Sequence, residues 1–474
     1  MRYRGLCFVL IALVQLAAVA TNQAVAQSGA IKISIDTQQR VGPMEISRFS
    51  LGQGGLSDAP MWEDRISEIQ SLHPALVRLF IQEYFNVYPK KSVYQWKTLD
   101  RSVETILATG ATPLMCVAIK PKALFPQINQ DIVEPGNYAE WEELIYQMVK
   151  HYEGKNITYW EVSNEPDIGE SGGCPSRFTP ENYPRFYEHT VKAIRRANPK
   201  AKVGGPALAN VRSSLFKALL EHCSKQSIPL DFVSWHIYSS EPLKIRQTID
   251  YAKSLLAGYS SLHPETILNE WNMSLRNPVQ DPRFQPCFVA EVAYQMFQAK
   301  LDYACYYHIR DYHVNMEQFS KFMSPQGNLF MARWWNEMPQ FDGLFDFQNV
   351  LRPAFFTFRF LTRLIGDRLA VESSNGEGQP HLISAYEPTR DRINTLIWNF
   401  DLSAPPEVSA NVEFKGIEND WNAWEVALDA ATASNDENRR LKKAELARVS
   451  PQSPELKISL EPYGVKMLTL EKRR

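Results

Sequence analysis

Short apolar runs alternate with longer amphipathic stretches from about residue 46 to residue 364. The short runs are rich in β-branched residues, and the longer ones carry apolar residues at helical spacing, which is typical of parallel strands joined by crossover helices. Eight strands are expected, at residues 46–52, 76–80, 112–118, 157–163, 202–207, 232–238, 266–269 and 303–309.

The stretches between these strands carry helix signals. They include residues 61–71, 99–109, 138–152 and 180–197, the last with Thr179 as N-cap and Pro180 at the first helical position. Eight strand–helix units over this length predict an α/β fold of the (β/α)8 TIM barrel type rather than an open sheet. Such barrels place their chemistry at the C-terminal ends of the strands.

The pattern changes after residue 364. Strands are expected at residues 381–387, 393–400, 408–414 and 457–460 without intervening helices, which predicts a C-terminal antiparallel β-sandwich domain. Residues 31–37 also alternate and are expected to add a strand to that sandwich, whereas residues 429–446 form either an exposed helix or a loop. The predicted units are an N-terminal strand in 27–45, a barrel in 46–364 and a sandwich in 365–474.

The first 26 residues resemble an export signal. Arg2 and Arg4 precede an apolar run over residues 6–20, and small residues allow cleavage after Ala20 or Ala26. An uncleaved anchor is the alternative, but the run falls short of the ~20 residues that span a bilayer. We therefore expect a secreted or periplasmic protein with no membrane contact after cleavage.

Composition narrows the classes of partner. Hydrophobic residues make up 44% of the chain and charged residues 22%, as in soluble globular proteins. The balance of 51 Lys+Arg against 53 Asp+Glu, without a long basic run, argues against a nucleic-acid partner. Oligomeric state is not indicated by any pattern.

The cysteines after the signal segment show no metal-binding spacing, so structural zinc is not expected. We also expect no other metal and no organic cofactor. The cysteines are Cys116, Cys174, Cys223, Cys287 and Cys305. Cys116 and Cys305 lie in strand-like runs and are expected to be buried thiols. A disulfide between Cys174 and either Cys223 or Cys287 stays open.

Two predicted strands end in a glutamate. The fourth ends in Asn164-Glu165-Pro166 and the seventh in Asn269-Glu270-Trp271-Asn272. A lone Asn-Glu-Pro is more often a turn, and Glu270 alone would fit a structural carboxylate paired with an arginine. Together they match glycosidic cleavage, which needs one acid for the leaving oxygen and a second carboxylate across the anomeric carbon.

These stretches resemble glycoside hydrolase clan A, and within it family 39. Further likeness lies in Val77-Arg78, Lys120-Pro121-Lys122-Ala123-Leu124, Gly343-Leu344-Phe345, Arg352-Pro353-Ala354-Phe355 and Pro462-Tyr463-Gly464-Val465. The resemblance spans nearly all of the mature chain. It implies a retaining, β-xylosidase-like hydrolase of carbohydrate, with Glu165 as general acid/base and Glu270 as nucleophile. A retaining pair should lie about 5 to 5.5 Å apart, whereas roughly 9 Å would indicate inversion.

Two departures bear on the substrate. Phe80 stands where the family often has His, and the eighth strand ends in Tyr307-His308-Ile309-Arg310-Asp311 rather than an aromatic pair. An α-L-arabinofuranosidase, a uronidase and a catalytically silent carbohydrate-binding protein therefore stay open as alternatives. His308, Arg310 and Lys120 are the candidates for binding an acidic group.

The remaining candidates surround the two glutamates. We expect Asn164 to hydrogen-bond the sugar 2-hydroxyl, Arg78 to keep Glu270 ionised, and Tyr238 to hydrogen-bond Glu270. His236 faces the same side of its strand as Tyr238 and is either a sugar ligand or a core histidine. Trp271 belongs to the same predicted substrate-binding set, and Glu161 is expected to be structural. Trp334 and Trp335, in the insertion 312–340, either wall the sugar site or pack on the barrel rim.

Overall fold

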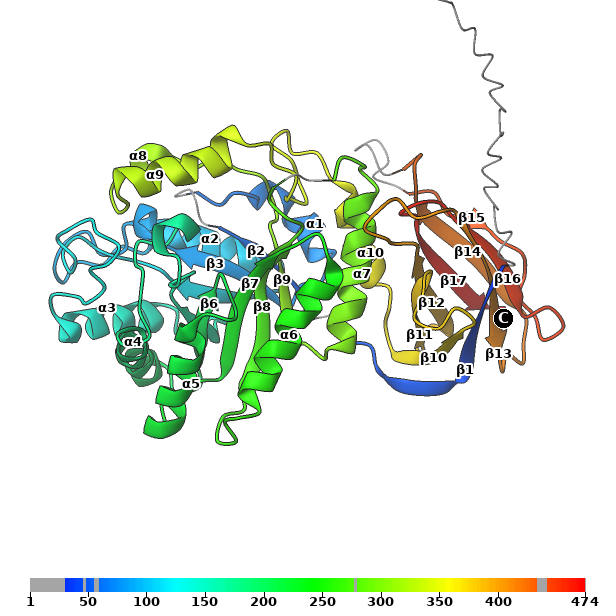
Figure 1. The fold of residues 1–474 in the computed structure, drawn as a ribbon, viewed down its shortest axis with the longest axis horizontal. Helices are drawn as coiled ribbons and strands as arrows, with labels where there is room; N and C mark the ends of the chain where they lie inside the picture. The colour runs from blue at the N-terminus through cyan, green and yellow to red at the C-terminus, as the bar shows by residue number, and fades with distance from the viewer. Residues whose placement is uncertain (1–29, 46–47, 55–58, 277–278, 433–440, 474) are drawn as a thin grey trace, which may run out of the picture.

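The computed structural model describes all residues except 1–29, 46–47, 55–58, 277–278, 433–440 and 474. The chain forms a barrel of strands and helices beside a separate sheet domain (Figure 1). The expected signal segment, residues 1–26, lies outside the described residues. None of the helices that are described is both long and apolar enough to cross a membrane.

Eight parallel strands close into a barrel in sequence order, and the first pairs with the last. They are β2 (Phe49–Gln53), β3 (Leu76–Ile81), β4 (Thr112–Val117), β5 (Tyr159–Val162), β6 (Lys202–Leu208), β7 (Phe232–Tyr238), β8 (Glu265–Asn272) and β9 (Tyr303–Tyr307). The predicted (β/α)8 barrel is confirmed. Of the first expected strand, residues 46 and 47 lie outside the described part.

Helices cover the outside of the barrel (Figure 1). The longer ones are α2 (Lys97–Ala108), α3 (Tyr138–His151), α4 (Tyr183–Ala197), α5 (Ser214–Gln226), α6 (Pro242–Leu256), α7 (Phe284–Gln298) and α10 (Pro353–Leu361), and α1 (Ile66–Gln70) is short. The helix expected from Pro180 begins three residues later. Asn182 turns back to accept a hydrogen bond from the Thr179 N–H, so residues 180–182 form a turn, and Pro184 occupies the first helical turn instead.

The barrel interior is layered because inward side chains recur at every second strand position. The lowest layer is apolar and seals the bottom, with Leu76, Leu114, Tyr159, Phe232, Ile267 and Cys305. Two residues further along the same strands lies a buried polar layer, with Arg78, Cys116, Glu161, Ser234 and Asn269. This polar layer is the floor on which the mouth of the barrel is built.

The second domain is a nine-stranded sheet in the order β15-β14-β17-β12-β11-β10-β1-β13-β16. Its members are β1 (Ile31–Pro43), β10 (Asp367–Ser373), β11 (His381–Glu387), β12 (Arg392–Trp398), β13 (Val408–Lys415), β14 (Trp421–Leu428), β15 (Ala444–Glu445), β16 (Glu455–Leu460) and β17 (Val465–Lys472). Strands from both ends of this sheet share one core, as in a sandwich.

The N-terminal strand joins this sheet, as expected. It pairs antiparallel with β10 and parallel with β13, so the sheet is antiparallel except for that one pair. The described residues of 429–446 form no helix, and residues 433–440 lie outside the described part. The five described cysteines are buried and free, so neither disulfide left open by the sequence is present.

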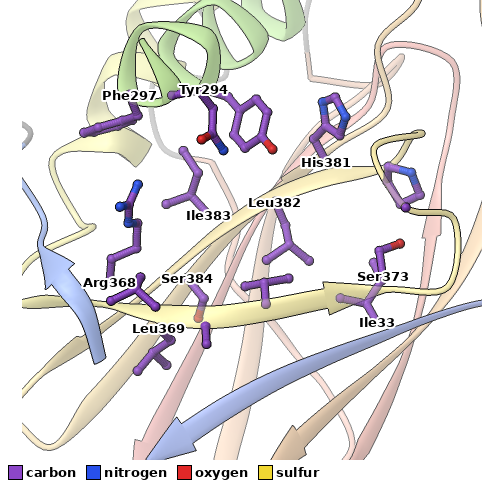
Figure 2. A pocket seen from close by; sticks show the side chains of 16 residues that line it. Ile33, Tyr294, Phe297, Arg368, Leu369, Ser373, His381, Leu382, Ile383 and Ser384 are labelled. Carbon is purple, nitrogen blue, oxygen red and sulfur yellow. The ribbon is translucent and has the colours of Figure 1, made fainter. Parts of the chain in front are cut away.

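Helix α7 of the barrel packs against the sheet domain around one buried acid. The Glu291 carboxylate accepts hydrogen bonds from Trp398 Nε1 and pairs with His381 Nδ1, both at 2.8 Å. The Tyr294 ring stacks on the His381 ring at 4.8 Å. A groove opens beside this contact, with Tyr294 and Phe297 of the helix facing the strands of the sheet (Figure 2).

The His381–Glu291 pair predicts a pH-dependent contribution to the stability of the domain interface. Burial alone would lower the pKa of His381, but the hydrogen bond and charge of Glu291 raise it. Burial would raise the pKa of Glu291, but His381 and the other donors lower it. The stabilisation is therefore complete between the usual pKa values of Glu and His, about 4.3 and 6.5. It is lost as pH rises through the raised pKa of His381 or falls through the lowered pKa of Glu291.

We therefore expect His381→Gln to lose on the order of 2 kcal/mol at pH 5.5, because a hydrogen bond to a charged group is removed, and less at pH 9. Differential scanning calorimetry at the two pH values measures this. His263→Gln, at an exposed histidine, is the control. An equal loss at both pH values would show that the ion pair does not contribute.

Candidate active site

A cavity of about 640 Å³ opens at the C-terminal end of the barrel. Its floor comes from the ends of β3, β5, β7, β8 and β9, and one wall comes from the segment 316–337. We call this segment the lid; it contains α8 (Met316–Phe319), α9 (Pro325–Ala332) and the π-helical turn η5 (Arg333–Glu337). The lining includes Phe80, Gln82, Asn164, Glu165, Tyr238, Glu270, Tyr307, Phe330, Met331, Trp334 and Trp335.

Glu165 reaches the cavity through a strained turn directly after β5. Ser163 and Glu165 have φ angles of 74° and 42°, a left-handed region that is costly for residues other than glycine. The Glu165 N–H donates to the Ala207 carbonyl at 2.8 Å, which helps to hold the turn. At Gly172, a Cβ atom would lie 1.9 Å from Glu165 Oε2, so only glycine allows the loop after Glu165 to close over it.

Glu270 reaches the cavity because β8 carries a bulge. The pairing of β7 with β8 shifts between Trp235 and His236, so that His236 lies opposite Glu270. Asn269 and Glu270 both point into the barrel as a result, because Asn269 donates to Glu161 and Glu270 lines the cavity.

The same bulge turns Trp271 outward, so its predicted place in the substrate-binding set is wrong. Trp271 is fully buried, and its ring packs against Tyr306, Phe288 and Phe358 beneath α7 and α10. Without the bulge, strict alternation would have turned Trp271 inward and Glu270 outward.

Arg78 is the centre of the polar layer and is 1% exposed. Its Nε donates to Glu161 and its Nη1 to Glu270, each at 2.7 Å, and its Nη2 donates to Asn164 Oδ1 at 2.8 Å. The guanidinium also lies 4.4 Å from the centre of the Phe80 ring. A single buried cation therefore orients both the Glu270 carboxylate and the Asn164 amide.

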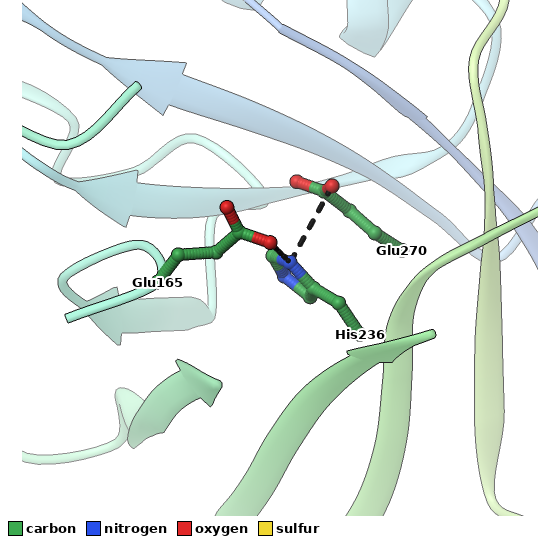
Figure 3. A group of neighbouring side chains, drawn as sticks. All are labelled: Glu165, His236 and Glu270. Carbon is green, nitrogen blue, oxygen red and sulfur yellow. Dashed lines mark hydrogen bonds and ion pairs between the residues drawn. The ribbon is translucent and has the colours of Figure 1, made fainter. Parts of the chain in front are cut away.

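Two side chains of β7 complete the arrangement. Tyr238 donates its hydroxyl to Glu270 Oε2 at 2.7 Å, the hydrogen bond expected from the sequence. His236 Nδ1 lies 2.8 Å from Glu165 Oε1 and 3.4 Å from Glu270 Oε2, so its ring stands between the two carboxyl groups (Figure 3). One oxygen of each glutamate and the imidazole nitrogen lie within 4.8 Å of one another.

The two glutamates have different electrostatic surroundings. Burial and then the charge of Glu270 raise the pKa of Glu165 well above its usual range. Burial also raises the pKa of Glu270, and because the charge and hydrogen bond of Arg78 and the hydroxyl of Tyr238 oppose this, its net upward shift is smaller than that of Glu165. Burial and the charge of Arg78 hold the pKa of His236 well below its usual range, so the imidazole is neutral. Glu165 therefore holds the proton, and Glu270 is the carboxylate.

Glu165, His236 and Glu270 form a cluster that by position could ligate a metal ion. Glu270 Oε1 and Oε2 already accept hydrogen bonds from Arg78 and Tyr238. The Arg78 cation already balances the charge of the Glu270 carboxylate, and it would repel a second cation placed between these groups. The donor set therefore fits acid–base work better than metal binding.

The basic candidates for an acidic substrate do not line the cavity. His308 is fully buried with its Nε2 3.1 Å from Asp311, and Arg310 donates to Asp64 at 3.0 Å and to the Met61 carbonyl. Lys120 donates to the carbonyl oxygens of residues 129 and 175. All three predicted roles in binding acidic groups are wrong, because each side chain has a partner within the protein.

Several lining residues carried no signal in the sequence. Gln82 follows β3; its Nε2 donates to the Gly173 carbonyl at 2.6 Å, while its buried Oε1 has no partner among the described residues. Phe330 and Met331 belong to the lid, together with Trp334 and Trp335. Of the two alternatives for these tryptophans, the structure shows that they wall the cavity. Glu161 is structural, as expected, because Arg78, Ser234 and Asn269 hold it in the floor.

Known proteins share this sequence pattern and fold. The family described as "Glycosyl hydrolases family 39" matches residues 69–413. A beta-xylosidase of Caldicellulosiruptor saccharolyticus is 23% identical over 354 residues, which are 69% of this chain and 68% of that protein. A crystal structure of the GH39 enzyme of Xanthomonas axonopodis pv. citri has a TM-score of 0.73 at 17% identity, covering 95% of this chain and 99% of that one. A monomeric beta-xylosidase of Caulobacter crescentus CB15 has a TM-score of 0.70 at 17% identity, covering 94% and 100%.

The charge of Glu270 should account for part of the raised pKa of Glu165. We expect Glu270→Gln to lower the pKa of Glu165, although not to its usual value, because burial remains. Asp167→Asn, which removes the weaker of the two like charges, should lower it less. Carboxyl ¹³C NMR titration, with the signal assigned through Glu165→Gln, measures these shifts. An unchanged or higher pKa in Glu270→Gln would mean that the two carboxyl groups do not interact.

Proposed function

The chain belongs to glycosyl hydrolase family 39 and is a glycoside hydrolase, and we propose that it is a retaining, β-xylosidase-like enzyme of oligosaccharides or short glycosides. In this proposal Glu270 is the nucleophile and Glu165 the general acid/base. The carbohydrate substrate enters the cavity at the barrel mouth, and no cofactor takes part in the mechanism.

The observation that carries this proposal is the short distance between two carboxyl groups in unlike surroundings. One oxygen of each lies within 4.8 Å of the other, whereas inverting enzymes keep their carboxyl groups about 6.5–9.5 Å apart to admit a water molecule. Retaining enzymes use about 5–5.5 Å. The short distance between the Glu165 and Glu270 carboxyl groups across the barrel mouth is therefore consistent with direct attack by one carboxylate on the sugar.

The chemistry then follows from the charges. The Glu270 carboxylate attacks the anomeric carbon and forms a glycosyl ester, while Glu165 transfers its proton to the leaving oxygen. Esterification removes the negative charge of Glu270, so the pKa of Glu165 falls and the group ionises. Ionised Glu165 accepts a proton from water, which attacks the anomeric carbon and releases the sugar with its configuration retained.

Asn164 is proposed to bind the sugar 2-hydroxyl, a contact that strengthens as positive charge develops on the ring. Its Oδ1 is occupied by Arg78, and one N–H of its amide donates to the Gly172 carbonyl at 3.0 Å. The second N–H is left for a hydroxyl oxygen, so Asn164 acts as a donor. His236, neutral and in contact with Glu165, is proposed to position the acid/base.

The residues of the cavity bear on the three alternative functions, a uronidase, an α-L-arabinofuranosidase and a catalytically silent binding protein. A uronidase needs a cation for the sugar carboxylate, yet Arg177, the one positively charged residue in the described lining, already pairs with Asp131 at 2.9 and 3.1 Å. An α-L-arabinofuranosidase remains compatible with the same pair of glutamates. A silent binding protein would not need two carboxyl groups with separated protonation states. Export of the enzyme is proposed from residues 1–26 alone.

The proposal that the substrate is a β-D-xyloside can be tested by comparing activity on different glycosides. We expect kcat/KM on aryl β-D-xylosides to exceed that on aryl α-L-arabinofuranosides and aryl uronides by about tenfold or more, the discrimination available from a few pocket contacts. A panel of 4-nitrophenyl glycosides measures it. A preference for the uronide would contradict the proposal, and activity on none of them would favour the silent binding protein.

Variants of the two glutamates test the division of labour. Glu165→Ala should still form the glycosyl-enzyme from a 2,4-dinitrophenyl glycoside, since that leaving group needs no proton, but should hydrolyse it slowly. Azide should then restore turnover and give a glycosyl azide of retained configuration. Glu270→Ala should lose activity on every substrate, and any azide product should be inverted. NMR of the products distinguishes the two, and the opposite assignment of configurations would reverse the proposed roles.

A further inference from the structure

The lid gives the outer part of the cavity an apolar wall. Phe330 and Met331 of α9 and Trp334 of η5 line it, and the Phe330 and Trp334 rings lie 6.1 Å apart. Ile168 and Leu275 extend the same surface from the loops after β5 and β8. Phe330 is 36% exposed and Ile168 37%, so this wall presents open apolar surface to whatever enters.

This wall lies on the side of the acid. The loop that closes over Glu165 continues through Gly172 and Gly173, and a Cβ at Gly173 would lie 3.0 Å from the terminal carbon of Met331. Because the group that protonates the leaving oxygen must face the leaving group, the part of the substrate next to Glu165 is the aglycone. The lid is therefore the surface that the aglycone meets.

The wall is anchored to the loop that carries the acid. Glu170, five residues after Glu165, is buried and accepts hydrogen bonds from the N–H and the hydroxyl of Ser324, which caps α9. At the other end, the Asn336 amide exchanges two hydrogen bonds with the Val314 backbone, at 2.7 and 3.0 Å. The apolar side chains are thus held in place before a ligand arrives, which reduces the entropy cost of binding.

The charged residues that line the cavity on this side are already engaged with the protein. Apart from the two glutamates, the charged residues of the described lining are Asp167 and Arg177. Asp167 accepts from the N–H groups of Ala209 and Asn210, both at 3.0 Å, and Arg177 makes two hydrogen bonds to Asp131. A second sugar at this place would stack on aromatic rings but would find few partners for its hydroxyl groups, and unpaired polar groups are costly to bury.

We propose that the lid selects glycosides whose aglycone is an apolar ring, aromatic or alicyclic, in preference to a second sugar. Phe330, Trp334 and Met331 are the residues that determine this specificity. The inference rests on the proposed function, because Glu165 as the acid defines the aglycone side. The proposed function specifies the sugar of the substrate, and this inference specifies its leaving group.

The test uses three β-D-xylosides whose leaving groups are all alcohols, so that differences in leaving-group acidity stay small: methyl, benzyl, and the disaccharide xylobiose. For the wild-type enzyme we expect kcat/KM on the benzyl glycoside to exceed that on the methyl glycoside by about 100-fold and that on xylobiose by about tenfold. Phe330→Ser should reduce the benzyl-to-methyl ratio about tenfold. This ratio does not depend on the fraction of folded enzyme.

Leu329→Ser is the matched control, because Leu329 is the neighbouring residue on α9, is 44% exposed and does not line the cavity. It should leave the ratio at the wild-type value, and Trp334→Ser should behave like Phe330→Ser. A wild-type enzyme that cleaves methyl xyloside and xylobiose but gains nothing from the benzyl group would overturn the inference and leave the proposed function standing. Equal losses on benzyl xyloside and xylobiose in Phe330→Ser would also overturn it, and inactivity on all three glycosides would refute both proposals.

Discussion

The buried guanidinium of Arg78 is the interaction on which the rest of the site depends. A cation this deep in a barrel is tolerated only when it is paired and hydrogen-bonded, and here Glu161 and Glu270 supply the charges and Asn164 an amide oxygen. Glu161 is in turn fixed by Ser234 of β7 and Asn269 of β8, which reach it across the barrel interior. The orientation of Glu270 is thus set by a network that spans four strands, β3, β5, β7 and β8, and removing Arg78 or either carboxylate would leave a buried charge without its partner.

This network also explains how two similar side chains acquire different protonation states. Arg78 and Tyr238 both donate to Glu270, whereas Glu165 faces a neutral imidazole and the negative charge of Glu270. Arg78 lowers the pKa of Glu270 directly, and it also helps to keep His236 uncharged. One buried cation therefore keeps the pKa values of the two carboxyl groups apart. A charged histidine between the groups would cancel that difference in pKa.

The sequence predicted whatever depends on periodicity and missed what depends on a local break in it. Strand positions, and hence the places of Arg78 and Tyr238, follow from alternation and from strand order. The bulge in β8 does not, and it reverses the directions that strict alternation gives to Glu270 and Trp271. Glu270 is still predicted from the resemblance of the strand ending, whereas the predicted place of Trp271 in the site is wrong. Arg310 illustrates a second limit, because a charged residue at a strand end looks the same whether its partner is a substrate or, as here, Asp64. The lining by Phe330 depends on where a long insertion folds back, which alternation does not encode.

The two parts of the site are built in ways that let them change independently. The polar layer is made of inward residues on barrel strands, where each side chain is fixed by several others, so substitutions there disturb the whole set. The apolar wall belongs to an insertion that is attached to the acid loop through Glu170 and Ser324, and its residues Phe330, Met331 and Trp334 line the cavity without belonging to a barrel strand. Since loops of such barrels vary while the strands keep the fold, the lid can alter which aglycone is accepted without moving Arg78 or Glu270. Gly172 constrains this independence, because a larger residue there would displace Glu165 and couple a change in the loop to the acid itself.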